Sequence, residues 1–118
     1  MPLEDFSIKQ EAAAGKPGVM LVHVAGYLDA HTYEQLEETI AELFGKNQYK
    51  IVVNLANVEY ISSAGAGVFI GALSEAQEHG GNIVLMSPTT NVGEVFDLLG
   101  LTQIFQVVDD QKTAFAAF

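Results

Sequence analysis

Apolar and polar positions follow two different periods along the chain, and short turn signals separate the segments. Residues 6–12 alternate in the manner of a strand, and AGKPG at 14–18 supplies a turn. VMLVHVAGYL at 19–28 is a more continuously apolar run, which is typical of a buried strand. Because a short turn joins the two runs, the pattern predicts an antiparallel hairpin.

Helical and strand-like segments then alternate along the chain. Apolar residues recur at helical spacing from Tyr33 to Phe44, and this helix is expected to end near Gly45. KIVVNL at 50–55 is rich in β-branched residues and predicts a strand that is buried on both faces at the sheet centre. A second apolar helical stripe, 66–76, follows and is ended by a pair of glycines.

The last part of the chain repeats the alternation with shorter segments. NIVLM at 82–86 predicts another central strand, and apolar residues at 92–99 form a third helical stripe closed by Gly100. A short strand from Ile104 and a last helix from Gln111 complete the expected elements.

This order of elements predicts the fold class. Strand, helix, strand, helix, strand implies parallel pairing through right-handed crossovers, and the hairpin adds an antiparallel edge. We therefore expect an α/β fold with a mixed sheet and about four helices. No linker or repeat divides the 118 residues, so residues 1–118 are expected to form a single domain. The pattern leaves open whether the helices cover one face of the sheet or both.

Composition and charge narrow the class of partner. The chain contains fifteen acidic residues, five lysines and no arginine. The resulting formal net charge of −10 disfavours nucleic acid as a partner. The absence of cysteine excludes a disulfide framework and a thiolate zinc site. No signal-peptide core and no run of about 20 apolar residues is present, so a cytoplasmic protein without membrane insertion is expected. A protein partner is expected to offer a basic contact patch.

YISSAGAG at 60–67 lies between the central strand and the second helix, where open α/β sheets place their sites. Gly65 and Gly67 form a G-x-G turn, but Ile70 stands where a dinucleotide fingerprint needs Gly or Ala. No G-x-x-x-x-G-K-[ST] motif is present either. The sequence therefore predicts no nucleotide cradle and no bound cofactor.

A hydrolase triad can be assembled by residue type from Asp29, His31 and Ser63. An acid and a histidine two residues apart rarely reach the geometry that such a relay needs, and Ser63 has no G-x-S-x-G elbow around it. The histidines also lack a metal-ligand spacing such as H-E-x-x-H. We expect no enzyme activity, no catalytic residue and no metal site.

The serines of this stretch have two interpretations from the residues alone. A serine is a good N-cap, and small residues let a helix pack tightly on a sheet. Alternatively, a phosphate on a serine at this position would meet unsatisfied backbone N–H groups and the positive end of the helix dipole. The small residues at 64–67 would then leave the hydroxyl open to a kinase.

Three segments resemble, in order and spacing, the STAS domain of the anti-sigma-factor antagonist family. GYLDAHTYEQLEETI from Gly26 resembles the family's G-E-L-D helix entry. VVNLANVEYISSAGAGVFIGAL from Val52 resembles its strand, D-S-S-G-L-G loop and helix. NIVLMSPTTNVGEVFDLLGL from Asn82 resembles the later strand and a helix that ends in a glycine and an apolar residue. The resemblance covers nearly the whole chain and implies a STAS fold.

The resemblance also implies a switch. It places Ser63 on the family's phosphorylatable serine and Asp29 on the acidic residue near that site. The unphosphorylated form would bind an anti-sigma serine kinase and free a sigma factor, phosphorylation would end the binding, and a PP2C-type phosphatase would restore it. The implied partner-binding residues are Asp29, Ser62, Ser63, Ala64, Gly65, Ala66 and Gly67.

Four positions depart from the family pattern. Ser62 stands where the pattern has Asp, which makes it an alternative phosphoacceptor, and Tyr27 replaces the usual Glu. Ala64 replaces a Ser or Thr, and Ala66 replaces a Leu. These departures leave a second interpretation open, a STAS protein-binding module of a transport or signalling assembly that is not phosphorylated.

Overall fold

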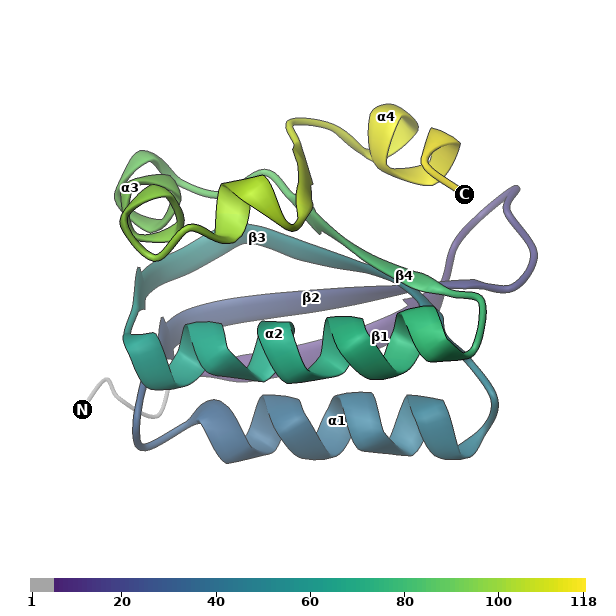
Figure 1. Cartoon of the computed structure of the whole chain (residues 1–118), viewed down its shortest axis with the longest axis horizontal. Coiled ribbons are helices and arrows are strands. Elements are labelled where there is room, and N and C mark those ends of the chain that lie inside the picture. The colour runs from purple at the N-terminus through teal and green to yellow at the C-terminus, as the bar shows by residue number, and fades with distance from the viewer. Residues whose placement is uncertain (1–5) are drawn as a thin grey trace.

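One mixed sheet with the strand order β1-β2-β3-β4-β5 organises the computed structural model, which describes residues 6–118 (Figure 1). β1 pairs with β2 in antiparallel fashion, and the other neighbours pair in parallel. The predicted mixed sheet is therefore confirmed. The strands are β1 (Ser7–Ala12), β2 (Val19–Leu28), β3 (Lys50–Ile61), β4 (Asn82–Met86) and β5 (Gln106–Val108).

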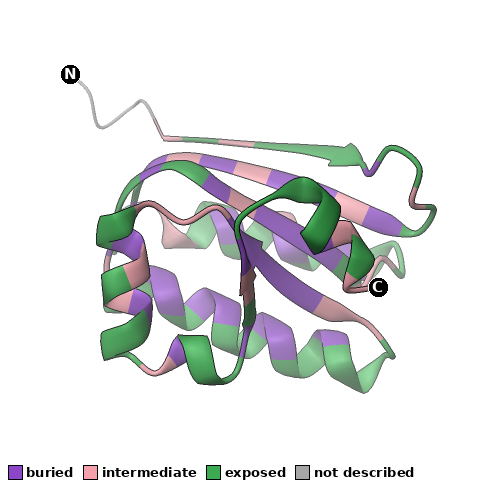
Figure 2. Ribbon diagram, turned by 90° about the horizontal axis from the view of Figure 1, so that it is seen from above, coloured by how far each residue is buried: buried purple, intermediate pink, exposed green. Residues whose placement is uncertain are grey.

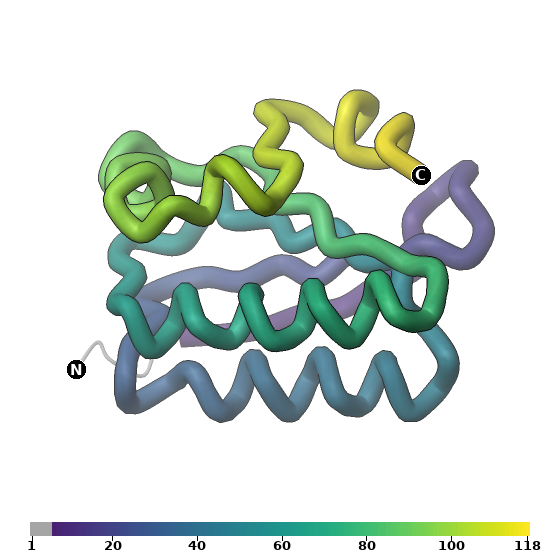
Figure 3. The backbone as a smooth tube through the Cα atoms, in the orientation of Figure 1, coloured from purple at the N-terminus to yellow at the C-terminus, as the bar shows by residue number. Residues whose placement is uncertain are grey.

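Four α-helices alternate with or follow these strands in the described part of the chain, as expected. They are α1 (Tyr33–Gly45), α2 (Ser63–Glu78), α3 (Thr90–Leu98) and α4 (Gln111–Ala116), and a short 3-10 segment, η2 (Leu101–Gln103), follows α3. The tube in Figure 3 shows α1 and α2 side by side on one face of the sheet, with α4 on the opposite side. The helices thus cover both faces, but unequally.

The larger core lies between the sheet and the pair α1 and α2. Phe69 of α2 is fully buried there, and its ring meets Phe96 of α3 and Phe105 edge-on, each at a centroid distance of 6.4 Å. Such edge-to-face pairs contribute stability beyond the area that they bury. They tie α3 and the segment after η2 to the main helical layer.

A smaller core lies on the other face of the sheet, beneath α4. Val52 of β3 belongs to this core together with Ala114 of α4, whereas Ile51 and Val53 point into the larger core. Phe115 and Phe118 at the end of the chain pack against it. The prediction that the KIVVNL segment is buried on both faces is therefore confirmed, and Figure 2 shows the buried residues concentrated in the central strands.

β3 is longer than the sequence pattern predicts. The expected end was Leu55, but the strand continues to Ile61. Its second half pairs with β2 alone, because β4 ends at Met86 opposite Asn54. One edge and one face of this half are open, so polar residues are tolerated there and the apolar run that marks a buried strand stops early.

Candidate functional site

The stretch at 60–67 joins a strand end to a helix start without a loop between them. β3 ends at Ile61, Ser62 is the N-cap, and α2 begins at Ser63. Ser62 has an extended backbone, and its hydroxyl accepts a hydrogen bond from the Gly65 N–H at 3.3 Å. The capping interpretation therefore applies to Ser62.

Ser63 occupies the first helical position of α2 and is exposed. Within residues 6–118 the structure records no hydrogen bond of its side chain, in contrast to that of Ser62. The first N–H groups of a helix lack partners inside the helix and lie at the positive end of its dipole. The geometry at Ser63 thus suits an added anionic group.

Gly65 fixes how α2 sits on the sheet. A Cβ atom at this position would lie 2.6 Å from the carbonyl oxygen of Leu28 and 2.8 Å from its Cγ, so no larger residue fits without movement. The same carbonyl accepts a hydrogen bond from the Ser62 N–H at 3.0 Å. The start of α2 is therefore held against the end of β2.

The other small residues divide into two groups. Ala66 is 1 % exposed and lies in the larger core, and Gly65 is also buried. These two residues therefore support the site from the protein interior. Ala64 and Gly67 are exposed, and a Cβ on Gly67 would meet nothing within 4 Å. Ser63, Ala64 and Gly67 are therefore the small residues of this stretch that a partner can reach.

Asp29 lies at the turn between β2 and α1. Its carboxylate accepts a hydrogen bond from the His31 N–H at 2.9 Å, and its N–H donates to the hydroxyl of Thr32 at 3.0 Å. That hydroxyl in turn donates to the carbonyl of Tyr27 at 2.7 Å. The half-buried Asp29 is thus held in a well-defined turn that leads into α1.

The structure joins the two chain segments that carry Asp29 and Ser63. Leu28 precedes Asp29 and Ser62 precedes Ser63, and the hydrogen bond between Leu28 and Ser62 makes these neighbours adjacent in space. The two predicted site segments therefore meet at one end of the sheet.

The same geometry gives a hydrolase triad no support. The Asp29 carboxylate accepts a hydrogen bond from the backbone N–H of His31, and no hydrogen bond between the His31 ring and Ser63 is recorded in the described residues. Across residues 6–118 no group of three His, Cys, Asp or Glu side chains could hold a metal ion.

Sequence reasoning missed an aromatic pair beside this site. Tyr27 and Tyr60 are paired in the register of β2 and β3, and their ring centroids are 5.9 Å apart. The two residues are 45 % and 49 % exposed. Each comes one residue before the Leu28 and Ile61 strand ends. The replacement of the family's Glu by Tyr27 was visible in the sequence. Its pairing with Tyr60 was not, because that pairing depends on the irregular register between β2 and β3.

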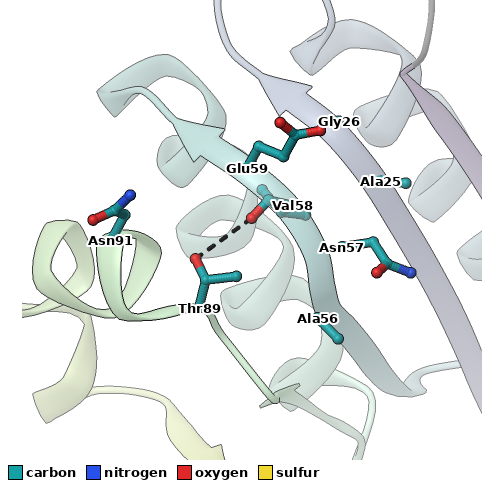
Figure 4. A pocket seen from close by; sticks show the side chains of 8 residues that line it. All are labelled: Ala25, Gly26, Ala56, Asn57, Val58, Glu59, Thr89 and Asn91. Carbon is teal, nitrogen blue, oxygen red and sulfur yellow. Dashed lines mark hydrogen bonds between the residues drawn. The ribbon is translucent and has the colours of Figure 1, made fainter.

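A wide depression lies next to the aromatic pair, over the open half of β3 (Figure 4). It measures about 610 Å³ and is lined by Ala25, Gly26, Ala56, Asn57, Val58, Glu59, Thr89 and Asn91. The Thr89 hydroxyl donates to the carbonyl of Val58 across it, at 3.5 Å. Because no lysine or arginine lines this depression, it offers no charged donor to an anionic ligand.

Taken together, fold and site define a small α/β binding domain with an exposed serine at a helix start. A model of the STAS domain family matches residues 11–114. The chain therefore belongs to the STAS-domain family of anti-sigma-factor antagonists. Members of this family act by binding, so the prediction that the protein is not an enzyme is confirmed.

Individual relatives agree with this assignment. An anti-sigma-B factor antagonist of Staphylococcus epidermidis is 34% identical over 86 residues, which are 73% of this chain and 80% of the relative. The anti-sigma factor antagonist SpoIIAA in its unphosphorylated form superposes with a TM-score of 0.78 at 22% identity, covering 92% of both chains.

The phosphorylated form of SpoIIAA from Bacillus gives a TM-score of 0.71 at 20% identity, covering 94% of this chain and 98% of that one. At these identities the two SpoIIAA structures establish the fold, and the expected STAS-like fold is confirmed. None of the helices in residues 6–118 is long and apolar enough to cross a membrane.

Proposed function

We propose that this protein is an anti-sigma-factor antagonist, with the whole chain acting as one STAS domain. Its unphosphorylated form binds an anti-sigma serine kinase and thereby releases a sigma factor. The observation that carries this proposal is the exposed Ser63 at the first position of α2, beside the turn that contains Asp29. The name of the Staphylococcus epidermidis relative supports the same role.

The choice of Ser63 as phosphoacceptor follows from the different environments of the two serines. The hydroxyl of Ser62 is occupied as the cap of α2, and that residue is half-buried. Ser63 is exposed. A kinase transfers the γ-phosphoryl group of ATP to the hydroxyl oxygen that it can reach, and the hydroxyl proton is lost as ADP leaves. Ser63 is therefore the acceptor and Ser62 the alternative.

The phosphate acts on the surface and leaves the fold intact. It adds about −1.5 to −2 charge at neutral pH, and the helix dipole of α2 accommodates that charge at Ser63. The segment that carries Asp29 is adjacent, and the chain already has a net charge of −10. Phosphorylation thus weakens a close interface by repulsion and desolvation. A PP2C-type phosphatase would remove the group and restore binding.

Mass spectrometry after incubation with the cognate anti-sigma serine kinase and ATP tests this function. We expect the wild type to bind the kinase and to gain one phosphate on Ser63. The Ser62→Ala variant should still be phosphorylated, and Ser63→Ala should not. Binding without any phosphate on either serine would favour the unphosphorylated STAS module, and a lack of binding would reject the antagonist role.

A further inference from the structure

A narrow apolar groove runs between α1 and α2, which lie side by side in Figure 1. It measures about 180 Å³, and Ile40 and Phe44 line it on the α1 side. Gly67 and Gly71 line it on the α2 side. The groove therefore begins one helical turn after Ser63 and leads away from that residue along the helical layer.

The two glycines of the groove are not required by the packing of the fold. A Cβ on Gly67 or Gly71 would meet nothing within 4 Å, whereas a Cβ on Gly65 would collide with Leu28. Glycine inside a helix destabilises it relative to alanine. The chain thus carries two helix-destabilising glycines that its own packing does not require, and both line the groove.

The rim of the groove is acidic. Glu37 lines it on one side and Glu75 on the other, and both are exposed. Helix α1 carries four glutamates and α2 carries two, and neither helix contains a lysine or arginine. No ion pair of Glu37 or Glu75 is recorded within residues 6–118. An occupant that neutralises these carboxylates must bring its own cations.

We infer that this groove receives a basic amphipathic helix of the anti-sigma partner. This inference rests on the proposed function and adds a second contact to the Ser63 surface. Apolar side chains of the partner helix lie over Gly67 and Gly71, and its lysines or arginines pair with Glu37 and Glu75. The eight residue steps from Gly67 to Glu75 span about 12 Å, so two to three turns of the partner make the contact.

The negative charge of the groove rim disfavours two other occupants of the groove. A second copy of this chain would bring another acidic helical layer and a net charge of −10 to the same surface. An anionic lipid surface would meet the same repulsion. A basic protein helix is the occupant whose charge is complementary to the rim.

Filling the groove at Gly71 separates this contact from the Ser63 surface, because Gly71 lies two turns further along α2. Gly93 in α3 provides the matched control: a Cβ there also meets nothing within 4 Å, and this residue does not line the groove. Calorimetry with the cognate anti-sigma kinase measures the dissociation constant, and thermal unfolding measures the fold. We expect Gly71→Leu to unfold no earlier than the wild type and to bind about tenfold or more weakly. Gly93→Leu should bind as the wild type does.

A charge-reversed variant, E37K/E75K, tests the rim at exposed positions that the fold does not need. We expect binding weakened by about tenfold or more, with a smaller loss of affinity on raising the salt concentration than the wild type shows. If Gly71→Leu does not fold, the affinity of E37K/E75K alone tests whether the partner binds the groove. Wild-type affinity in both E37K/E75K and a folded Gly71→Leu would overturn the groove contact and leave the proposed function standing. A wild type that does not bind the kinase overturns both.

Discussion

Leu28 and Gly65 are in direct backbone contact, so closely that a Cβ on Gly65 would lie 2.6 Å from the Leu28 carbonyl oxygen. The same oxygen accepts the hydrogen bond from the Ser62 N–H. Ser62 and Gly65, the N-cap and a residue of the first turn of α2, are thus both held against the end of β2. This contact determines where the exposed hydroxyl of Ser63 stands relative to the turn at Asp29.

Replacement of Gly65 by alanine should destabilise the protein, because the added methyl group forces α2 away from Leu28. We expect the free energy of unfolding to fall by about 1–3 kcal/mol, as for other overpacked sites. Gly67→Ala is the matched control, since its methyl group meets open space. That variant should be about 0.5–1 kcal/mol more stable than the wild type. Chemical denaturation measures both, and equal effects at the two glycines would contradict the packing role of Gly65.

The cap at Ser62 predicts a stability difference between the two serines. Ser62→Ala removes the acceptor of the Gly65 N–H and should lower the free energy of unfolding by about 1 kcal/mol. Ser62→Asp introduces the residue of the family pattern, which is also a good cap, and should keep the stability of the wild type. Thermal unfolding measures these variants. A fully stable Ser62→Ala would show that the cap contributes little.

A negative charge at Ser63 should weaken partner binding without unfolding the domain. Ser63→Asp mimics part of the phosphate charge, and we expect its affinity for the cognate anti-sigma kinase to fall by about tenfold. Gln111 is also the first residue of its helix and follows a capping residue, Asp110. Gln111→Asp therefore places the same charge at a helix start on the other face of the sheet, and it should bind normally. Equal affinities of Ser63→Asp and the wild type would reject the charge mechanism.

The exposed pair of Tyr27 and Tyr60 predicts an aromatic contact with the partner. Both rings adjoin the strand ends that carry the site, and exposed tyrosines are frequent anchors at interfaces. Alanine at either position should weaken kinase binding by about tenfold and lower the free energy of unfolding by less than about 1 kcal/mol. Ile104, which is 53 % exposed and precedes β5 at the far edge of the sheet, is the control. An effect of Ile104→Ala as large as that of the tyrosines would indicate a non-specific loss.

The sequence was sufficient for the order of elements and for the expectation that the serines at 62 and 63 stand at a helix start. Helical spacing and β-branched runs mark the segments whose burial is strong, such as the part of β3 around Val52. The second half of β3 was not predicted because one edge and one face of it are open, so its sequence lacks the continuous apolar run of a buried strand. The contact between Tyr27 and Tyr60 had no sequence signal, because it depends on the register shifts between β2 and β3 after His23 and Gly26.

The pattern of apolar and polar positions also did not predict that the helices cover the two faces of the sheet unequally. Nothing in the spacing of the last segment says which face of the sheet it meets, and only the three-dimensional packing places Ala114 and Phe115 over Val52. The division of the serines had a partial signal, because Ser62 and Ser63 both suit a helix start. Their roles separate once the hydrogen bond from Gly65 selects Ser62 as the cap.

The cap of α4 predicts a pH dependence for the docking of this helix. The Asp110 carboxylate accepts a hydrogen bond from the Thr113 N–H at 2.8 Å, and this bond lowers the pKa of Asp110 from its ordinary value of 3.8. A lowered pKa in the folded state means that the ionised form stabilises the helix. The contribution is therefore present above about pH 3.8 and is lost as the pH falls through the lowered folded-state pKa. Asp110→Asn keeps a capping oxygen without the titration. NMR signals of Phe115 and Phe118 report the docking of α4. We expect these signals to differ between the wild type and Asp110→Asn at pH 7, and the difference to shrink as the pH falls through the lowered pKa of Asp110. A difference between the two proteins that does not change with pH would contradict this role of Asp110.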